Sequence, residues 1–370
     1  GHGSEKVWTD ERILDEKFIR DLRNEQYPFL VTATCDFGRQ DDPLTISSAE
    51  ISLTLDVGGS IGLVTTTRSV NAATNFGLNA AFYAALFERN EDGYATIGEI
   101  FRKTKNNSVS GVNNRNFSLI GDPSMTLALP EYSVDVTYVK TASGSDTLKA
   151  LSPVTVRGRV LNPSGSLASD FSGTVEVTLY DRERQFVTIG KNDPPFQYRQ
   201  WDNAVFRGKA SVTDGEFEIN FIMPKNISAQ VAPGRLSIYA FDPQDDIDAI
   251  GFSTTKIGGV EPDAEVDTAP PVISVFMGDT TFVNGGITSP NTDLVVRLED
   301  ESGINISATN PDHSIIAELD GDERTFLLND YYVADVDTWK KGYIRFPFHD
   351  LEPGRHEMTV HASDIHNNRA

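Results

Sequence analysis

The pattern of apolar residues changes near residue 130, and no other feature of the sequence restricts the possible folds as strongly. Before residue 130, strand-like and helix-like patterns alternate; after it, helical patterns nearly vanish and short stretches alternate apolar with polar residues. Strands that alternate with helices predict a mostly parallel sheet covered on both faces. Short alternating strands predict all-β sandwiches. The 370 residues are therefore expected to form an α/β part followed by β modules.

The spacing of apolar residues predicts the elements of the first part. Helices are expected at residues 10–23, 47–55, 71–89 and 96–105. Buried strands are expected at residues 29–34 and 60–66. Ser47 and Thr96 are each followed, three positions on, by a glutamate, which is the capping-box pattern of a helix start. One face of the first helix would carry Ile13, Leu14, Phe18, Ile19 and Leu22.

The second part divides into two β modules. The first has predicted strands at residues 153–162, 173–181, 207–223 and 234–242, and the second at 293–300, 314–321, 343–348 and 355–364. Asp214-Gly215 lies between two alternating runs and is typical of a hairpin turn. An acidic stretch rich in glycine and proline favours a linker. The predicted domains are residues 1–130, 131–258 and 272–370, with the linker at 259–271.

Charge and composition exclude some classes of partner. The net charge is −22, which disfavours nucleic acids and anionic membranes as partners because both repel an acidic surface. The sequence contains no run of 18 apolar residues, so no transmembrane segment of its own is predicted. The chain lacks an initiator methionine and opens within a motif, so we expect it to be part of a longer protein.

Cys35 and His2 are the residues most suited to chemistry. Cys35 is the only cysteine and follows the predicted strand at 29–34, at the sheet edge where catalytic groups gather. A single thiol fits a cytosolic protein and equally an exported one whose thiol is reserved for chemistry. His2 lies between two glycines, and an imidazole can take up and return the proton of a thiol nucleophile. The competing interpretations are a buried, inert cysteine and a cloning remnant at residues 1–4.

An ordered set of motifs resembles the gingipain-like cysteine peptidases. His-Gly-Ser, then Trp8, an amphipathic helix and an apolar strand ending in Cys-x-x-Gly come in the order that this family has. Further matching stretches are residues 47–50, 58–70, 96–106 and 116–130. Within the family, the branch that acts as the sortase of the type IX secretion system is similar at residues 32–43, 245–252, 266–286, 298–307, 327–332 and 351–368. The resemblance spans essentially the whole chain.

The resemblance implies a fold and a set of roles. The fold would be the end of a caspase- and gingipain-like α/β peptidase domain followed by two immunoglobulin-like sandwiches, the last one truncated. Cys35 would be the nucleophile and His2 the general acid and base. The backbone N–H groups of Gly3 and Cys35 would bind the oxyanion. An upstream acidic residue assists the histidine in other members, and the region that would hold it is absent from this sequence.

The sortase branch also implies a location and partners. The enzyme would lie on the extracellular face of the outer membrane, after export through the periplasm, and would need no cofactor. It would remove C-terminal secretion signals from cargo proteins and attach the cargo to anionic lipopolysaccharide. A β-barrel protein of the outer membrane would anchor it. Two alternatives remain open: a secreted endopeptidase that only hydrolyses, and a non-catalytic surface-binding scaffold.

Several other polar residues are weaker candidates. Asp36, Asp41 and Asp42 could hold calcium or form a solvated acidic loop. The Asp- and Asn-rich stretches 298–305 and 363–368 could hold structural calcium or form Asx turns. Arg68 could line the crevice near Cys35 or be an ion-paired surface residue, and Asp122 is expected in a turn. His356 and His361 would face opposite sides of one strand, which makes them poor joint metal ligands.

Overall fold

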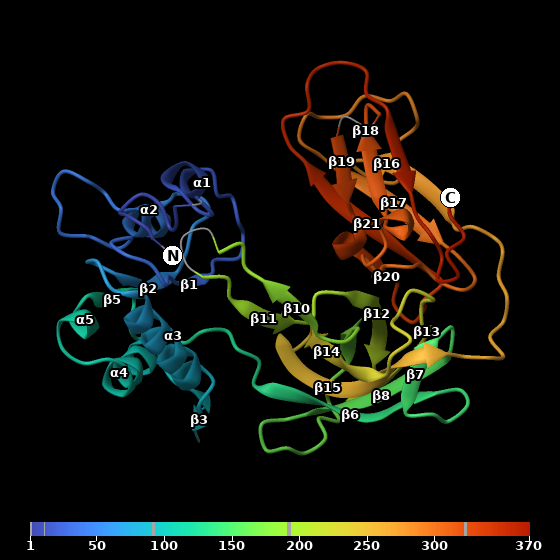
Figure 1. Cartoon of the computed structure of the whole chain (residues 1–370), viewed down its shortest axis with the longest axis horizontal. Coiled ribbons are helices and arrows are strands. Elements are labelled where there is room, and N and C mark those ends of the chain that lie inside the picture. Colours follow the sequence, from blue (N-terminus) through green and yellow to red (C-terminus); the bar gives the residue numbers. More distant parts are fainter. Residues whose placement is uncertain (1, 11, 91–92, 191–193, 322–323) are drawn as a thin grey trace. The chain divides into compact units, whose positions relative to one another are not determined.

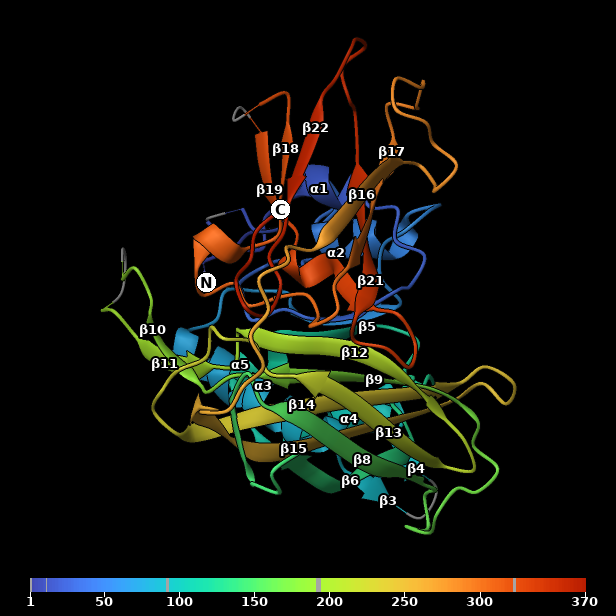
Figure 2. The same ribbon diagram turned by 90° about the vertical axis from the view of Figure 1, so that its right-hand side faces the viewer.

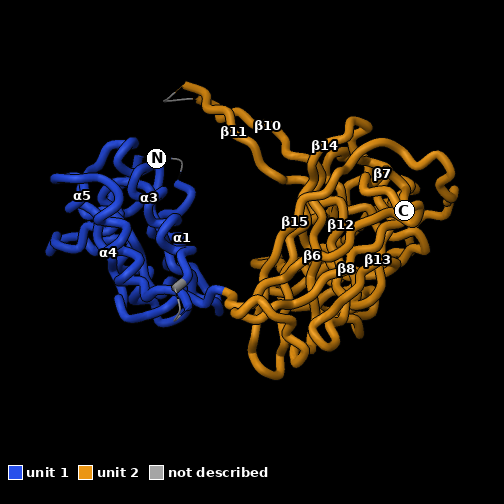
Figure 3. The backbone as a smooth tube through the Cα atoms, turned by 90° about the horizontal axis from the view of Figure 1, so that it is seen from below, with its two compact units in different colours: residues 1–129 blue, residues 130–370 orange. Residues whose placement is uncertain are grey.

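The chain divides into two compact units. The structure, a computed structural model, describes residues 2–10, 12–90, 93–190, 194–321 and 324–370. Unit 1 is Gly1–Leu129 and unit 2 is Pro130–Ala370 (Figure 3). Among the described residues, no helix combines the length and the apolar character that crossing a bilayer requires. The predicted division of residues 131–370 into two domains and a linker stays a prediction.

Unit 1 is built on a three-stranded sheet with helices on both faces (Figure 1). Its strands, in the order β1-β2-β5, are β1 (Phe29–Val31), β2 (Gly62–Thr66) and β5 (Phe117–Gly121). β1 and β2 are parallel as expected, but β5 is antiparallel to β2, so the prediction of a mostly parallel sheet is wrong for the described strands. A short hairpin joins β3 (Arg89–Asn90) and β4 (Gly93–Tyr94).

Two core clusters explain why the sheet is covered on both sides. Leu63 of β2 packs with Ile19, Phe37 and Ile51 on one face, and its neighbour Val64 packs with apolar residues of the other helices. Successive strand residues point to opposite faces, so a strand buried on both faces is apolar throughout. The helices are α1 (Glu16–Arg20), α2 (Ser48–Thr54), α3 (Ala72–Leu86), α4 (Ile97–Asn107) and α5 (Val112–Arg115).

The first helix is much shorter than the sequence predicts. Residues 10–23 were expected to be helical, but α1 begins only after Asp15, whose side chain accepts a hydrogen bond from the Phe18 N–H. Val7 pairs with Asp15 in a β-bridge, which turns the preceding segment back on itself. Ile13 and Phe18 are 74% and 55% exposed, so the predicted apolar face is wrong for them. By contrast, the Ser47–Glu50 capping box is present at the start of α2.

The larger sheet of unit 2 closes around a single apolar core. Its main path is β12-β9-β14-β15-β6-β8-β13 (Figure 2), and β7 pairs with β15. Alternate residues of these strands are buried in one common cluster, as in a sandwich. The strands are β6 (Tyr132–Thr141), β7 (Thr147–Ala150), β8 (Pro153–Leu161), β9 (Gly173–Tyr180), β12 (Ala204–Val212), β13 (Glu216–Ile222), β14 (Ala232–Asp242) and β15 (Ile247–Val260).

The predicted turn at Asp214-Gly215 is confirmed, but the hairpin that it suggested is not. Thr213 and Glu216 exchange backbone hydrogen bonds across the turn, and both central residues have positive φ, 53° and 76°. Beyond the turn, β12 pairs with β9 and β13 pairs with β8. A separate hairpin, which the sequence did not reveal, joins β10 (Arg184–Val187) and β11 (Gln197–Gln200) and projects from the unit (Figure 3).

The last part of unit 2 consists of two smaller sheets around a second core. One has the order β16-β17-β21-β20 and the other β19-β18-β22. Their elements are β16 (Val272–Met277), β17 (Thr292–Glu299), β18 (Ile316–Leu319), β19 (Arg324–Leu327), β20 (Tyr332–Ala334), β21 (Lys341–Phe348), β22 (Met358–His361), and the 3-10 turns Pro311–His313 and Asn329–Tyr331. The immunoglobulin-like assignment of both parts stays a prediction.

Candidate active site

Cys35 lies just beyond the carboxyl end of β1, in a loop that stays bonded to β2. The Thr32 N–H donates to the Val64 carbonyl (2.9 Å), and the Thr66 hydroxyl donates to the Thr34 carbonyl (2.6 Å). Further on, the Gly38 N–H donates to the Thr66 carbonyl (2.9 Å). β1 ends at Val31 and is shorter than the predicted strand at residues 29–34. These hydrogen bonds still hold Cys35 at the edge of the sheet, as the sequence predicts.

The loop is anchored immediately after the cysteine. Phe37 is completely buried in the core beneath it. Asp36 adopts a positive φ of 57°, a conformation that aspartate tolerates better than most residues, and its carboxylate accepts a hydrogen bond from the Ser69 hydroxyl (2.8 Å). The Cys35 thiol itself is half-buried, with Sγ 3.3 Å from the carbonyl oxygen and 3.5 Å from the nitrogen of Val70. It is therefore not sealed inside the core.

The His2-Gly3 segment lies against the residue that precedes Cys35. A Cβ atom on Gly3 would be 2.2 Å from Thr34 Oγ1 and 2.5 Å from the Trp8 carbonyl oxygen, so only glycine fits at this position. His2 is exposed on the surface of the unit. Gly1, which flanks His2 in the motif, lies outside the described residues. The two predicted catalytic segments, more than thirty residues apart in the sequence, thus meet at Gly3 and Thr34.

The backbone amides of the predicted oxyanion hole have no hydrogen-bond acceptor in the part of the chain that the structure describes. Neither the Gly3 N–H nor the Cys35 N–H donates a hydrogen bond to any described residue. Buried N–H groups usually have a partner within the protein, whereas Gly3 and Cys35 are only half-buried, so their N–H groups stay open to a ligand or to solvent. Unpaired amides that converge near a nucleophile can bind the negative oxygen of a tetrahedral intermediate.

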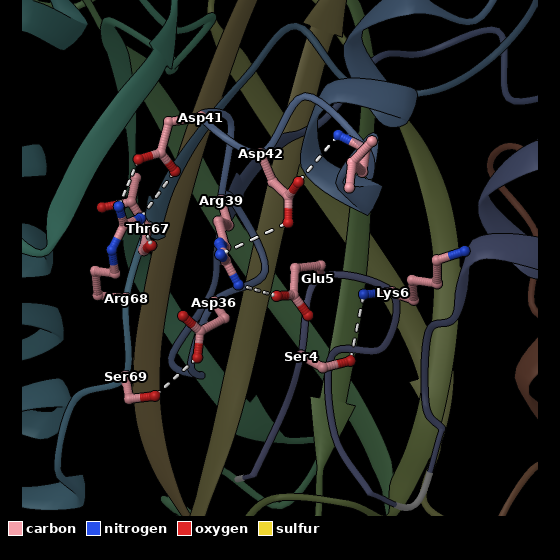
Figure 4. A network of polar contacts seen from close by, with 11 residues as sticks. Ser4, Glu5, Lys6, Asp36, Arg39, Asp41, Asp42, Thr67, Arg68 and Ser69 are labelled. Carbon is pink, nitrogen blue, oxygen red and sulfur yellow. Dashed lines mark hydrogen bonds and ion pairs between the residues drawn. The ribbon is translucent and has the colours of Figure 1, made fainter.

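Charged side chains surround this loop in a defined network (Figure 4). Arg39 donates to Glu5 (2.8 Å) and lies 3.6 Å from the Asp42 carboxylate. On the other side of the loop, Arg68 forms a two-point ion pair with Asp41, and this guanidinium lowers the pKa of that carboxyl. Glu5 and Asp42 therefore share Arg39, whereas Asp41 is paired with Arg68.

The network and the turn at Asp122 bear on three weaker expectations. Asp36, Asp41 and Asp42 contact Ser69, Arg68 and Arg39, respectively, and calcium binding by these carboxylates stays a prediction. Arg68 is paired with Asp41 and is exposed, so it is the ion-paired surface residue that was one of its two expected roles. Asp122 accepts hydrogen bonds from the N–H and hydroxyl of Ser124, which confirms the predicted turn.

Three acidic residues converge in unit 2. Carboxylate oxygens of Asp267, Asp300 and Asp364 lie within 4.8 Å of one another. Burial raises the pKa of Asp300 to about 6, and it also raises the pKa of Asp364. Asp300 and Asp364 belong to the two stretches singled out in the sequence, whereas Asp267 was missed because nothing local links it to them. Structural calcium at this cluster stays a prediction.

The two histidines near the last strand have separate partners. His356 precedes β22 instead of lying in it, so its predicted place in the strand is wrong. The Glu352 carbonyl oxygen, 2.7 Å from its Nε2, and the Asp320 carboxylate, 2.7 Å from its Nδ1, raise the pKa of His356. His361 lies at the end of β22, with Nδ1 3.3 Å from the Ala370 carbonyl oxygen. They do not form a common site.

Comparisons with known proteins agree with the motifs. A crystal structure of dimeric latent PorU from Porphyromonas gingivalis is 31% identical, with a TM-score of 0.41, and the match covers 77% of this chain and 28% of that one. The Arg-specific cysteine proteinase gingipain R is 18% identical, with a TM-score of 0.32, and the match covers 70% of this chain and 52% of that one. The chain thus spans about a quarter of PorU and about half of gingipain R. No curated protein matches the sequence.

One family model covers the part of the chain that holds Cys35 and His2. Residues 1–128 match peptidase family C25, and this range coincides almost entirely with unit 1. Residues 1–128 therefore belong to peptidase family C25, which confirms the gingipain-like cysteine peptidase segment that the motifs indicate.

Proposed function

We propose that this chain is part of a cell-surface cysteine peptidase and transpeptidase of the type IX secretion system. The enzyme removes the C-terminal secretion signals of cargo proteins and attaches the cargo to anionic lipopolysaccharide. It acts on the extracellular face of the outer membrane, held there by a β-barrel partner, and uses no cofactor in the reaction. The PorU-like motifs along the whole chain support the sortase branch, and the C25 segment supports the peptidase chemistry.

The reaction proceeds through a thioester on Cys35. The thiolate attacks the scissile carbonyl, a C–S bond forms, and the carbonyl oxygen becomes an oxyanion that the N–H groups of Gly3 and Cys35 bind. The C–N bond then breaks, and the leaving amine takes a proton from the His2 imidazolium. An amine of the acceptor attacks the thioester, loses its proton to His2 and regenerates the thiolate. If water attacks instead, the same intermediate gives hydrolysis.

The contact between Gly3 and Thr34 carries this proposal. It brings the His2 segment to the residue next to Cys35, although the two lie far apart in the sequence. The half-buried thiol and the two unpaired amides supply the other groups that acyl transfer needs.

The test uses the full-length protein, a cargo protein with a tagged N-terminus and a small primary amine. Mass spectrometry of the tagged product reads its new C-terminus. An amide with the added amine supports the transpeptidase, and a free carboxylate alone supports an endopeptidase that only hydrolyses. Intact cargo with the wild-type protein would contradict both and leave the non-catalytic scaffold. The Cys35→Ala variant is the control for contaminating peptidases.

A further inference from the structure

We propose that Arg39 is a positioning residue that holds the His2 segment (residues 2–5) in register with the Cys35 loop (residues 34–42). The inference rests on the proposed function and deepens it, because it names the contact that sets the distance between the two reacting side chains. Arg39 touches neither substrate nor thiol. It acts through the side chain of Glu5, three residues after His2, and through the loop that carries Cys35.

The contacts of Arg39 connect the two segments directly. Its Nη1 donates to Glu5 Oε1 at 2.8 Å, and its Nη2 is 3.6 Å from Asp42 Oδ2. Its own N–H donates to the Asp36 carbonyl at 3.0 Å, so the arginine is fixed to the turn that follows Cys35. Figure 4 shows the guanidinium between the carboxylates of Glu5 and Asp42. The fork geometry of arginine suits such a two-sided contact.

This ion pair has no substitute in the described chain. Of the described residues, Glu5 and Arg39 are the one pair of oppositely charged side chains that joins residues 2–10 to residues 32–46. The Glu5 carbonyl also accepts a hydrogen bond from the Ser48 N–H (2.7 Å), so Glu5 is held by its backbone and by its side chain. Residue 5 is therefore a fixed point from which the exposed His2 extends.

Precise placement matters because the imidazole has no other support. His2 is exposed and makes no hydrogen bond to a described residue, so the backbone of residues 2–5 decides where its ring lies. Proton transfer needs donor and acceptor within hydrogen-bond reach, and an error of about 1 Å can cost about 100-fold in rate. The side chains of Arg39 and Glu5 are 39% and 26% exposed, and ion pairs that are this exposed contribute little to the stability of the fold. Its loss should therefore affect catalysis more than folding.

The test compares Arg39→Gln, Glu5→Gln and the double variant in the full-length protein. We expect each single variant to lower kcat for cargo cleavage by about 10- to 100-fold, with KM within about 2-fold of wild type. The double variant should lose no more than either single one, because both remove the same contact. Arg68→Gln removes the neighbouring ion pair with Asp41 and should keep wild-type kinetics.

A second readout follows the thiol itself. In Arg39→Gln, the pH profile of Cys35 alkylation by iodoacetamide should shift toward the profile of the His2→Ala variant. The unfolding temperature of Arg39→Gln should stay near that of the wild type. Unchanged kcat in both single variants, or additive losses in the double, would overturn the role of Arg39. If Arg39→Gln does not fold, Glu5→Gln decides alone. Full activity of Cys35→Ala would instead overturn the proposed function, whatever the Arg39 variants do.

Discussion

The Gly3 backbone lies so close to Thr34 that a Cβ atom on residue 3 would be 2.2 Å from Thr34 Oγ1. The same atom would be 2.5 Å from the Trp8 carbonyl oxygen and 2.8 Å from that of Val7, and backbone oxygens cannot rotate away. The contact explains why a glycine follows His2. It also places one of the two unpaired amides next to the segment that carries the nucleophile.

Replacing this glycine should separate the two segments. We expect Gly3→Ala to reduce cargo cleavage by the full-length protein at least about 100-fold, because residue 3 must move away from Thr34. Gly77→Ala, in α3 of the same unit, is the matched control, since its Cβ would meet only Val109 Cγ1 at an ordinary 3.5 Å. Cleavage rates of the two variants check the prediction. Wild-type activity in Gly3→Ala would show that this close approach is dispensable.

Phe37 should anchor the Cys35 loop from below. Its side chain is completely buried, so Phe37→Ala should lower the free energy of unfolding by about 3 to 5 kcal/mol and weaken the loop that holds the thiol. Phe76 is 77% exposed, and Phe76→Ala should change stability by less than about 0.5 kcal/mol. Denaturant unfolding of both variants measures the difference. Equal stabilities would mean that Phe37 does not anchor the loop.

Asp300 should make unit 2 less stable as the pH rises from about 4 to about 6. Its pKa is raised to about 6 in the folded protein and is near 3.8 in the unfolded chain, so the folded state binds the extra proton in this window. The difference between these two pKa values corresponds to about 3 kcal/mol, and solvent screening reduces the contribution to roughly 1 to 2 kcal/mol. Asp300→Asn should reduce this slope, as thermal unfolding at several pH values can show, and Asp364, whose pKa burial also raises, contributes the remainder. An unchanged slope in Asp300→Asn would assign it to other groups.

A matched control and a metal titration complete that experiment. Asp122 has a lowered pKa, so its contribution to stability is lost as the pH falls, and Asp122→Asn should leave the Asp300 slope intact. Calcium addition tests the prediction of structural calcium at the three carboxylates. If calcium binds there, it should raise the unfolding temperature of the wild type and not that of Asp300→Asn. Equal responses of the two proteins would place calcium elsewhere.

Local sequence signals predicted local structure well. The Ser47 capping box, the turn at Asp214-Gly215 and the position of Cys35 after a strand all follow from short-range chemistry, namely hydrogen bonds to free helix amides and backbone freedom in a tight turn. The apolar spacing of residues 10–23 misled because the bridge between Val7 and Asp15 and the cap at Asp15 override helix propensity there.

The site residues that were missed depend on contacts distant in sequence. Glu5 and Arg39 are 34 positions apart, and no pattern of charges along the chain indicates that they meet. Asp267 joins Asp300 and Asp364 only after three separate segments fold together. The direction of β5 was not predictable either, since an apolar run does not by itself show whether its strand is parallel or antiparallel to its neighbour.

The most direct test of the account is to look for the acyl-enzyme on Cys35. Full-length protein is mixed with tagged cargo, quenched in acid within the first turnover and digested for mass spectrometry. The account predicts a cargo fragment joined to the peptide that contains Cys35 by a thioester, which hydroxylamine releases and which Cys35→Ala never forms. Cargo cleavage by Cys35→Ala at the wild-type rate, with no adduct on residue 35 of the wild type, would contradict it.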